Sequence, residues 1–405
     1  MAVDELEYDD RQKALRREFY VELERIAHWW LDYGWDHERG GFFGEVGVDN
    51  TPVPEAEKGV VLNTRILWFF CELSRTVDAP RYRKAAERSY HYILEHFLDK
   101  AHGGVYWMLD CNGRPTDTKK QVYAQAFAIY ALLAYYQLTQ EPRALCEAKK
   151  AFALLERHTV DREKGGYLEA FTREWEVMED ARLSTKDLNY PKTMNTHLHV
   201  VEAYTTLYQV DPSQDVADAL RYSIDCFDRY IINKGNFHLR MFMDHDWRDH
   251  SPGFTYGHDI ECSWLLAKAV ESLGDESVTR RLRPTLIAMA DVCLKEAMGE
   301  HGEMYDGYEF DRHRVNQERV WWVQAEAMVG YYKAYCLSGE DRFYLAAERL
   351  WRFMQKYQMA GDSGEWLWLS TLDDQSHAPP YKLGAWKGPY HNGRAMLEMI
   401  RMLNN

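Results

Sequence analysis

A short pattern, a polar turn with glycine followed by aromatic or apolar residues, recurs six times along the chain, roughly every 60 to 70 residues. Its first three copies, DHERGGFFGEV, DKAHGGVYWML and DREKGGYLEAF, begin at Asp36, Asp99 and Asp161. The later copies are less regular, with turn glycines at Gly235, Gly302 and Gly364. Such a repeat means that one structural unit is built several times, and that its copies bury one another's apolar faces.

Each repeat predicts two helices. Before each turn lies a helix with one charged face, as shown by the apolar residues Leu15, Phe19, Leu23, Ile26 and Trp30 at three- and four-residue steps. Its counterparts are predicted near 81–98, 141–158, 213–231, 276–297 and 340–357. After each turn comes a helix that is apolar almost all round, such as QVYAQAFAIYALLAYY. A helix of that kind must be covered on all sides.

Twelve helices, alternately half-exposed and buried, predict an all-α fold of the (α/α)6 barrel type. Six inner helices are then ringed by six outer ones. An open solenoid of the same hairpins is the alternative, but it should carry polar capping helices at its ends, and the last helix is as apolar as the others. No linker divides the chain, so we expect residues 1–405 to form a single catalytic domain.

Charge and cysteine content exclude several classes of protein. A net charge of −15 argues against nucleic-acid binding. Seven scattered cysteines without a CxxC pair suggest neither a zinc site nor a disulfide framework. The polar N-terminus has no apolar segment of signal-peptide type, and the longest apolar run, ILWFFC, is too short to span a membrane. We expect a cytoplasmic protein without a membrane partner, as a monomer or homodimer.

In a closed barrel the six connections gather at one end, and the first turns of the inner helices face one shared space. A buried helix start tolerates a capping residue and little else that is polar. The side chains found there instead are Arg65, Tyr123, Gln125, Asn195, His199, His258, Glu261, Trp322, Glu326, Trp386 and His391. Three histidines, an arginine and two carboxylates at one height predict a functional site.

Spacing selects among these residues. His197 and His199 are two residues apart and point to opposite sides of their helix, whereas Asn195 and His199 share a face. We therefore expect His199 to face the lumen. His258 and Glu261 are three residues apart, which predicts that the carboxylate orients the imidazole and raises its basicity.

The residue types favour proton transfer at carbon. The sequence has no HExxH zinc motif, no GxSxG nucleophile motif and no phosphate-binding glycine loop. Paired histidines can act as base and protonated acid near neutral pH. Arg65 could stabilise an enediolate, and Trp322 and Trp386 offer flat apolar faces to a sugar.

Seven motifs resemble the cellobiose 2-epimerases of the N-acylglucosamine 2-epimerase superfamily, from about residue 15 to the C-terminus. These motifs are KGVVLNTRILW, HGGVYWML, KKQVYAQAFAIYAL, KTMNTHLHVVEAYTTLY, YGHDIECSWLL, VWWVQAEAMVGY and WKGPYHNGRAMLEMI. The resemblance implies an (α/α)6 barrel without a metal or nucleotide cofactor. It also implies reversible inversion at C2 of the reducing-end glucose of β-1,4-linked disaccharides, through a cis-enediolate: cellobiose to glucosyl-mannose and lactose to epilactose.

The resemblance also implies residue roles. His258 and His391 fall on the proton-transfer pair, His199 on a third histidine near the ring oxygen, and Arg65 on the residue that stabilises the enediolate. The implied substrate contacts are Tyr123, Asn195, Asp187, Glu261, Glu326 and the stacking Trp322 and Trp386. Glu261 also matches the carboxylate paired with the base. The fifth connection is longer than usual, and its active-site glutamate is predicted to be Glu303, with Glu309 as the alternative.

Three other functions remain open at this point. A monosaccharide-acting relative, either a mannose 2-epimerase or a mannose–fructose isomerase, would use nearly the same histidines. An inverting glycosidase would use Glu261 and Glu326 as its two carboxylates, leaving the histidines without a role. A sugar-binding protein without catalysis is the third.

Overall fold

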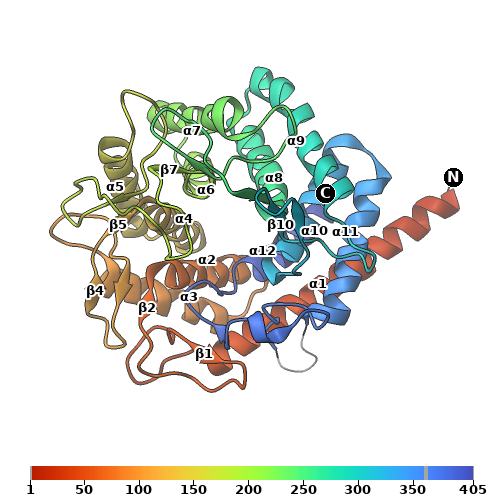
Figure 1. The fold of residues 1–405 in the computed structure, drawn as a ribbon. Coiled ribbons are helices and arrows are strands. Elements are labelled where there is room, and N and C mark those ends of the chain that lie inside the picture. Colours follow the sequence, from red (N-terminus) through yellow and green to blue (C-terminus); the bar gives the residue numbers. More distant parts are fainter. Residues whose placement is uncertain (1, 360–363, 405) are drawn as a thin grey trace.

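The alternation of buried and half-exposed helices builds two concentric rings (Figure 1). The computed structural model describes residues 2–359 and 364–404. The inner ring consists of α2 (Val60–Thr76), α4 (Val122–Thr139), α6 (Met194–Val210), α8 (Tyr256–Leu273), α10 (Trp321–Ser338) and α12 (His391–Met402). The outer ring consists of α1 (Ala2–Tyr33), α3 (Pro80–Tyr92), α5 (Pro142–His158), α7 (Gln214–Cys226), α9 (Glu276–Glu296) and α11 (Asp341–Phe353). The predicted (α/α)6 barrel is confirmed.

The inner ring is closed, so the solenoid alternative is wrong. Each inner helix packs against the next, and α12 packs against α2. The first five inner helices are each followed by their outer partner, whereas the partner of α12 is α1, from the other end of the chain. The N- and C-terminal helices thereby form the sixth pair.

Short antiparallel strands join neighbouring connections at one end of the barrel. The pairs are β2 (Lys58–Gly59) with β3 (Met108–Leu109), β5 (Lys120–Gln121) with β6 (Ala170–Phe171), β7 (Lys192–Thr193) with β8 (Phe242–Met243), β9 (Gly253–Thr255) with β10 (Gly307–Glu309), and β12 (Tyr381–Leu383) with β1 (Val46–Gly47). A single bridge between Val320 and Leu369 completes the circle. Hairpin strands β4 (Pro115–Asp117) and β11 (Arg314–Asn316) extend two of the pairs.

One feature is common to the six glycine turns. In each, an antiparallel bridge closes the turn: Trp35–Phe42, Leu98–Val105, Val160–Tyr167, Ile232–Leu239, Met298–Met304 and Met359–Trp366. Gly235 lies in the fourth turn as predicted, but it does not occupy the position of the first glycine in the earlier turns. Phe237, with φ of 64°, takes that place, because its N–H donates to Asn233 O just as the N–H of Gly103 donates to Asp99 O.

An ion pair ties most of these turns to the start of the next inner helix. The pairs, with their N···O distances, are Asp36–Lys58 (2.7 Å), Asp99–Lys120 (2.9 Å), Asp161–Lys192 (2.9 Å), Glu303–Arg319 (2.9 Å) and Glu365–Lys387 (3.1 Å). In the fourth repeat, His238 and Asp259 take their place at 2.7 Å. The pairs are largely buried, so they fix each connection against the mouth of the barrel.

Within residues 2–359 and 364–404, no helix has both the length and the apolar character that crossing a membrane requires. The seven cysteines are all free thiols.

Candidate active site

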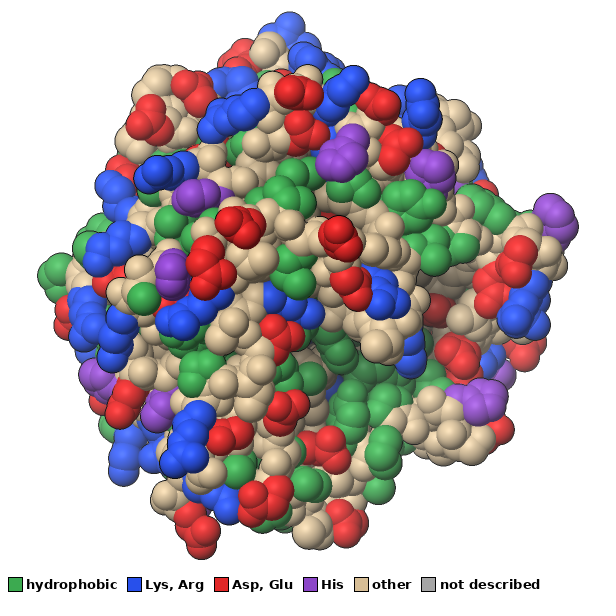
Figure 2. Space-filling view, turned by 60° about the vertical axis from the view of Figure 1, so that its left-hand side comes forward, with side chains coloured by type: hydrophobic (Ala, Val, Ile, Leu, Met, Phe, Trp, Pro, Cys, Tyr) green, Lys and Arg blue, Asp and Glu red, His purple; other side chains and the backbone are tan. Residues whose placement is uncertain are grey.

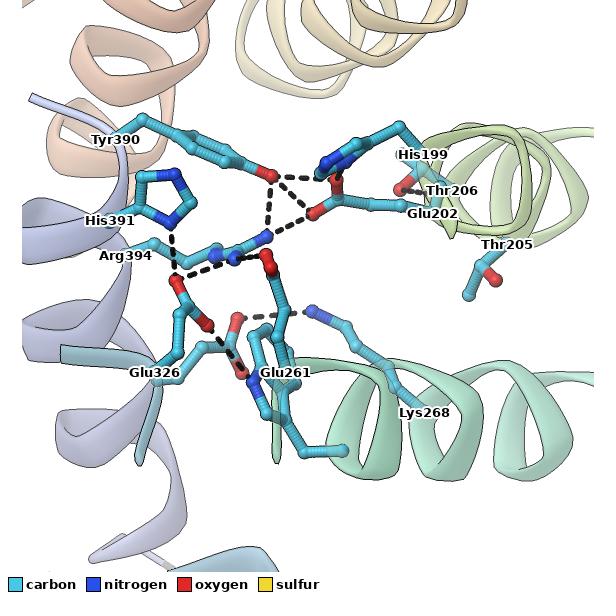
Figure 3. A network of polar contacts seen from close by, with 12 residues as sticks. His199, Glu202, Thr205, Thr206, Glu261, Lys268, Glu326, Tyr390, His391 and Arg394 are labelled. Carbon is cyan, nitrogen blue, oxygen red and sulfur yellow. Dashed lines mark hydrogen bonds and ion pairs between the residues drawn. The ribbon is translucent and has the colours of Figure 1, made fainter. Parts of the chain in front are cut away.

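Polar side chains from four inner helices and their starts meet in one network (Figure 3). Helix α6 contributes His199 and Glu202, and α8 contributes Glu261. Helix α10 contributes Glu326, and α12 with the residue before it contributes Tyr390, His391 and Arg394. All seven are buried, so their partners decide their charge.

Arg394 lies at the centre of this cluster. Its Nη1 is 2.5 Å from a carboxylate oxygen of Glu202 and its Nη2 is 2.7 Å from Glu326, and it also donates to Glu261 and Tyr390. Burial by itself raises the pKa of Glu202, but Arg394 and hydrogen bonds from His199 and Tyr390 outweigh it and lower that pKa. The guanidinium therefore favours the charged form of Glu202 in the barrel interior, whereas burial raises the pKa of Glu326 even beside Arg394.

Two of the histidines are held by carboxylates. Nδ1 of His391 lies 2.7 Å from Glu326, and Nδ1 of His199 lies 2.9 Å from Glu202. Glu326 also accepts from the indole of Trp264 at 3.1 Å. A carboxylate that accepts from Nδ1–H leaves Nε2 as the nitrogen available to a substrate.

The prediction that Glu261 orients His258 is wrong. Nδ1 of His258 lies 2.5 Å from the hydroxyl oxygen of Thr255, and Glu261 accepts from Arg394. A three-residue spacing places two side chains on one face of a helix, but it does not exclude a stronger partner from another helix.

His258 and His391 border one aromatic ring. The centroid of Trp322 is 4.8 Å from that of His258 and 5.4 Å from that of His391. Imidazoles delivered by the fourth and sixth inner helices therefore face a common space.

A second group of predicted residues lies beside His199. Nη2 of Arg65 donates to the hydroxyl of Tyr123 at 2.8 Å, and the rings of Tyr123 and His199 are 4.9 Å apart. Trp386 lies 6.3 Å from Tyr123, centroid to centroid. Among the residues that the structure describes, no carboxylate pairs with Arg65. Its positive charge is therefore available to a ligand.

Three buried polar atoms of the site have no hydrogen-bond partner among the described residues: Nε of Arg65, Oδ1 of Asn195 and Nε of Arg394. Unpaired buried polar atoms are costly, and their presence in a pocket indicates where a polar ligand would bind.

Two cavities open among the predicted residues. One, of about 80 Å³, is lined by residues that include Asp187, Asn195 and His258. The other, of about 210 Å³, lies against Trp107, Ser184 and Trp386. The surface in Figure 2 shows hydrophobic side chains gathered in a hollow, with acidic side chains around it. Larger grooves between outer helices contain none of the predicted site residues.

The third connection supplies a wall to both cavities. Its residue Asp187 accepts hydrogen bonds from the backbone and hydroxyl of Ser184, at 2.9 and 2.8 Å. This turn places Asp187 in the smaller cavity and Ser184 in the larger.

The structure contradicts the choice of Glu303 as an active-site glutamate. Glu303 is fully buried in the fifth turn, where it pairs with Arg319 and accepts from the backbone of His301 at 2.8 Å. Its alternative, Glu309, pairs with Arg314 in the β10–β11 hairpin at 2.8 Å. Glu326 is the carboxylate of the fifth repeat that joins the histidines.

Burial disfavours the charged form of all three histidines in the free site. It lowers the pKa of His258 to about 4, and it also lowers the pKa of His199 and of His391 despite the nearby carboxylates. The sequence-based expectation of a protonated ring near neutral pH used the ordinary histidine pKa, whereas burial lowers the pKa of all three rings in the free protein.

Three ligand atoms of Glu261, Glu326 and His391 lie within 4.8 Å of one another and could hold a metal ion. The guanidinium of Arg394 donates to both carboxylates, so this cluster already has its cation. A metal ion would have to displace that side chain.

Sequence reasoning overlooked four residues: Thr255, Glu202, Tyr390 and Arg394. A signal existed for two of them. Glu202 follows His199, and Arg394 follows His391, by the three residues that place side chains on one helical face.

Other polar residues at the helix starts are structural. Gln125 bonds both backbone groups of Val105, at 2.8 and 2.9 Å, and His197 accepts from the backbone of Tyr167 at 3.0 Å. They fasten the glycine turns to the inner ring.

Comparisons with known proteins agree with this architecture. Residues 41–395 match the profile of the family described as N-acylglucosamine 2-epimerase (GlcNAc 2-epimerase). The chain is 39% identical to a cellobiose 2-epimerase of Bacteroides fragilis, over 95% of this chain and 98% of that protein. It is 24% identical to a D-mannose isomerase of Marinomonas mediterranea, over 90% and 92%. The solved structure of a cellobiose 2-epimerase from Bacillus thermoamylovorans superposes with a TM-score of 0.90 at 35% identity, covering 96% of this chain and 99% of that one.

Proposed function

Because the chain belongs to the N-acylglucosamine 2-epimerase family, whose members are carbohydrate isomerases, we propose that it inverts C2 of the reducing-end glucose of β-1,4-linked disaccharides. Cellobiose would give glucosyl-mannose and lactose would give epilactose, reversibly. The relatives named as cellobiose 2-epimerases support this substrate class.

The observation that carries the proposal is the shared position of His258 and His391. Both rings border Trp322, at centroid distances of 4.8 and 5.4 Å. Inversion at carbon needs one group to remove a proton from one face and another to return a proton to the opposite face. Two imidazoles from different helices around one stacking surface fit that requirement.

The reaction begins with opening of the sugar ring, beside His199. Nε2 of one imidazole then removes the C2 proton, and the electron pair forms the C1–C2 double bond of a cis-enediolate, with negative charge on the oxygens. After rotation about C2–C3, the other imidazole, carrying a proton, donates it to the opposite face of C2. The first ring ends protonated and the second neutral, and exchange with solvent restores both.

Arg65 stabilises the enediolate. It is buried and has no carboxylate partner among the described residues, so its charge is not neutralised before the substrate forms negative oxygen. Asn195 and Tyr123 contact the sugar hydroxyls, and Asp187 and Glu261 complete the polar surroundings. Trp322 and Trp386 pack against the apolar faces of the rings.

The imidazole that acts as the acid gains its proton when the sugar binds. Burial disfavours protonation of the free imidazoles, and it lowers the pKa of His258 to about 4. Asp187 is the charged group that raises this pKa. Substrate binding should therefore be accompanied by uptake of a proton from buffer.

Incubation with cellobiose, lactose, mannose and glucose in D₂O, followed by NMR, tests the proposal. We expect epimerised disaccharide with deuterium at C2. Fructose formed from mannose, with disaccharides unchanged, would instead assign a monosaccharide isomerase, the activity named for the Marinomonas relative. Free glucose from cellobiose would indicate a glycosidase.

A further inference from the structure

Thr255 makes an unusual contact at the start of α8. A threonine at this N-cap position usually accepts a hydrogen bond from a backbone N–H of the first turn. Thr193 does so at the start of α6, accepting from Thr196 at 3.2 Å. Thr255 makes no such bond, and its hydroxyl oxygen lies 2.5 Å from Nδ1 of His258. The hydroxyl that would otherwise cap the helix contacts the imidazole instead.

In the other two histidines of the site, the partner of Nδ1 is a carboxylate. Nδ1 of His391 faces Glu326, and Nδ1 of His199 faces Glu202. A carboxylate brings negative charge and favours the imidazolium form. A hydroxyl can hold the ring in place, as donor or acceptor, without adding charge.

We infer that Thr255 is a positioning residue, whose hydroxyl holds Nδ1 of His258 so that Nε2 of this ring is the nitrogen offered to the sugar. This inference rests on the proposed function, because it gives His258 a proton transfer at C2. It makes the two histidines unequal. Nδ1 of His391 is held by a carboxylate, whereas Nδ1 of His258 is held by a hydroxyl.

Several titratable groups lie around His258. Burial lowers the pKa of His258 to about 4, and Asp187 opposes that change. Asp306, whose pKa burial raises to about 6, lies next to Thr255, since its backbone oxygen accepts from Tyr256 N at 2.9 Å. Other titratable neighbours are His391, across Trp322, and Glu169, Arg182 and Tyr190, which line the same cavity as His258. A pH profile of activity would contain the titrations of several of these groups, so the test must measure a property of the His258 ring itself.

The variants Thr255→Val and Thr255→Ser separate the hydroxyl from the shape of the side chain. Valine keeps the branched shape and removes the hydrogen bond, whereas serine keeps the hydroxyl. We expect kcat of Thr255→Val to fall about 10- to 100-fold, the range seen when a partner that orients a functional histidine is removed. KM should stay unchanged, because no sugar-contacting residue is altered. Thr255→Ser should retain most of kcat.

NMR of the ¹⁵N-labelled histidine rings provides a readout that does not depend on turnover. In the wild type and Thr255→Ser, the two ring nitrogens of His258 should show one fixed tautomer. In Thr255→Val, they should shift toward an average of two tautomers, while melting temperatures of both variants remain close to wild type. Unchanged kcat and unchanged ring shifts in Thr255→Val would overturn the inference.

The two proposals fail in different ways. If the wild type does not epimerise cellobiose or lactose, the proposed function fails, and the ring shifts of the free protein still test Thr255. If the wild type is active and Thr255→Val matches it in kcat and in ring shifts, only the role of Thr255 fails.

Discussion

At the scale of single residues, Arg394 determines the charge of the barrel interior. It is the cation shared by Glu202, Glu261 and Glu326, and it also supports Glu326 behind His391. Removing one partner from a buried ion pair leaves an uncompensated charge, which is far more costly than losing a surface pair.

Arg394→Met is therefore predicted to lower the free energy of unfolding by about 3–5 kcal/mol. Urea denaturation followed by far-UV circular dichroism measures this. The matched control is Arg352→Met, which removes an exposed pair with Glu18 and should cost under about 1 kcal/mol. Equal losses in the two variants would mean that Arg394 does not hold the carboxylates.

The titration of Glu202 makes the free energy of unfolding depend on pH. Burial raises its pKa, but Arg394 and the hydrogen bonds from His199 and Tyr390 outweigh burial, so the folded-state pKa lies below the ordinary value. Its contribution is then fully present above the ordinary carboxyl pKa of about 4.3, and is lost as the pH falls toward the folded-state value.

Glu202→Gln is thus predicted to be less stable than wild type at pH 7, with the gap narrowing as the pH falls from about 5 to 3. Urea midpoints at three pH values measure the gap. Glu340→Gln, which alters an exposed pair with Arg342, serves as control and should stay within about 1 kcal/mol of wild type throughout. A gap for Glu202→Gln that widens in acid would reverse the sign and contradict the assignment.

At the scale of elements, the glycine turn is the repeated device that directs the chain from the outer ring to the inner. Gly104 has φ of 69°, and a Cβ there would lie 2.5 Å from Oε1 of Gln125 and 2.9 Å from Trp175. Gln125 is the residue that fastens Val105. The second glycine is therefore required by backbone conformation and by close packing together.

Gly104→Ala and Gly274→Ala form a matched pair. Gly274, at the end of α8, has φ of 67°, and a Cβ there would meet no atom within 4 Å. Both substitutions place alanine in a left-handed backbone conformation, which should lower the free energy of unfolding by about 1–2 kcal/mol. Only Gly104→Ala also creates a steric clash, which should lower it by about another 1–3 kcal/mol. Denaturant unfolding of both variants tests this, and equal losses would show that the turn has room for a side chain.

The helices were predictable because periodicity reports burial directly. Helix α4, for example, begins at Val122, one residue into the predicted stretch QVYAQAFAIYALLAYY, since an apolar run of this kind must be covered on all sides. The strands at the mouth were not predictable. They are two or three residues long, and their pairing depends on connections from different repeats.

The site was predictable in part. Sequence position placed His199, His258, Glu326 and His391 at inner helix starts, where the structure has them. The partners were not predictable, because they come from helices distant in sequence: Arg394 takes Glu261 away from His258. Glu303 was misassigned, because a buried structural pair and an active-site carboxylate look alike in sequence.

At the scale of the whole molecule, the two chain ends are joined. The indole of Trp30 in α1 donates to Glu365 at 2.7 Å, and that of Trp366 donates to Glu22 in α1 at 2.6 Å. Strand β1 also pairs with β12. The sixth repeat is complete only with residues from both ends of the chain.

We propose on this basis that residues 1–405 form one cooperative domain. Calorimetry should show a single unfolding transition whose calorimetric and van't Hoff enthalpies agree. Glu22→Gln with Glu365→Gln, which weakens the bonds between the ends, should lower the temperature of that transition without splitting it. Two resolved transitions in the wild type would contradict a single domain.

The central claim is that two histidines serve opposite faces of one carbon. The most direct measurement follows C2–H exchange in D₂O with His258→Asn and His391→Asn, each given cellobiose and, separately, its C2 epimer. We predict that neither variant inverts C2. Each variant should exchange C2–H for deuterium in only one of the two sugars, and the sugar should differ between the two variants. Exchange of the same sugar by both variants, or inversion near the wild-type rate by either, would contradict the account.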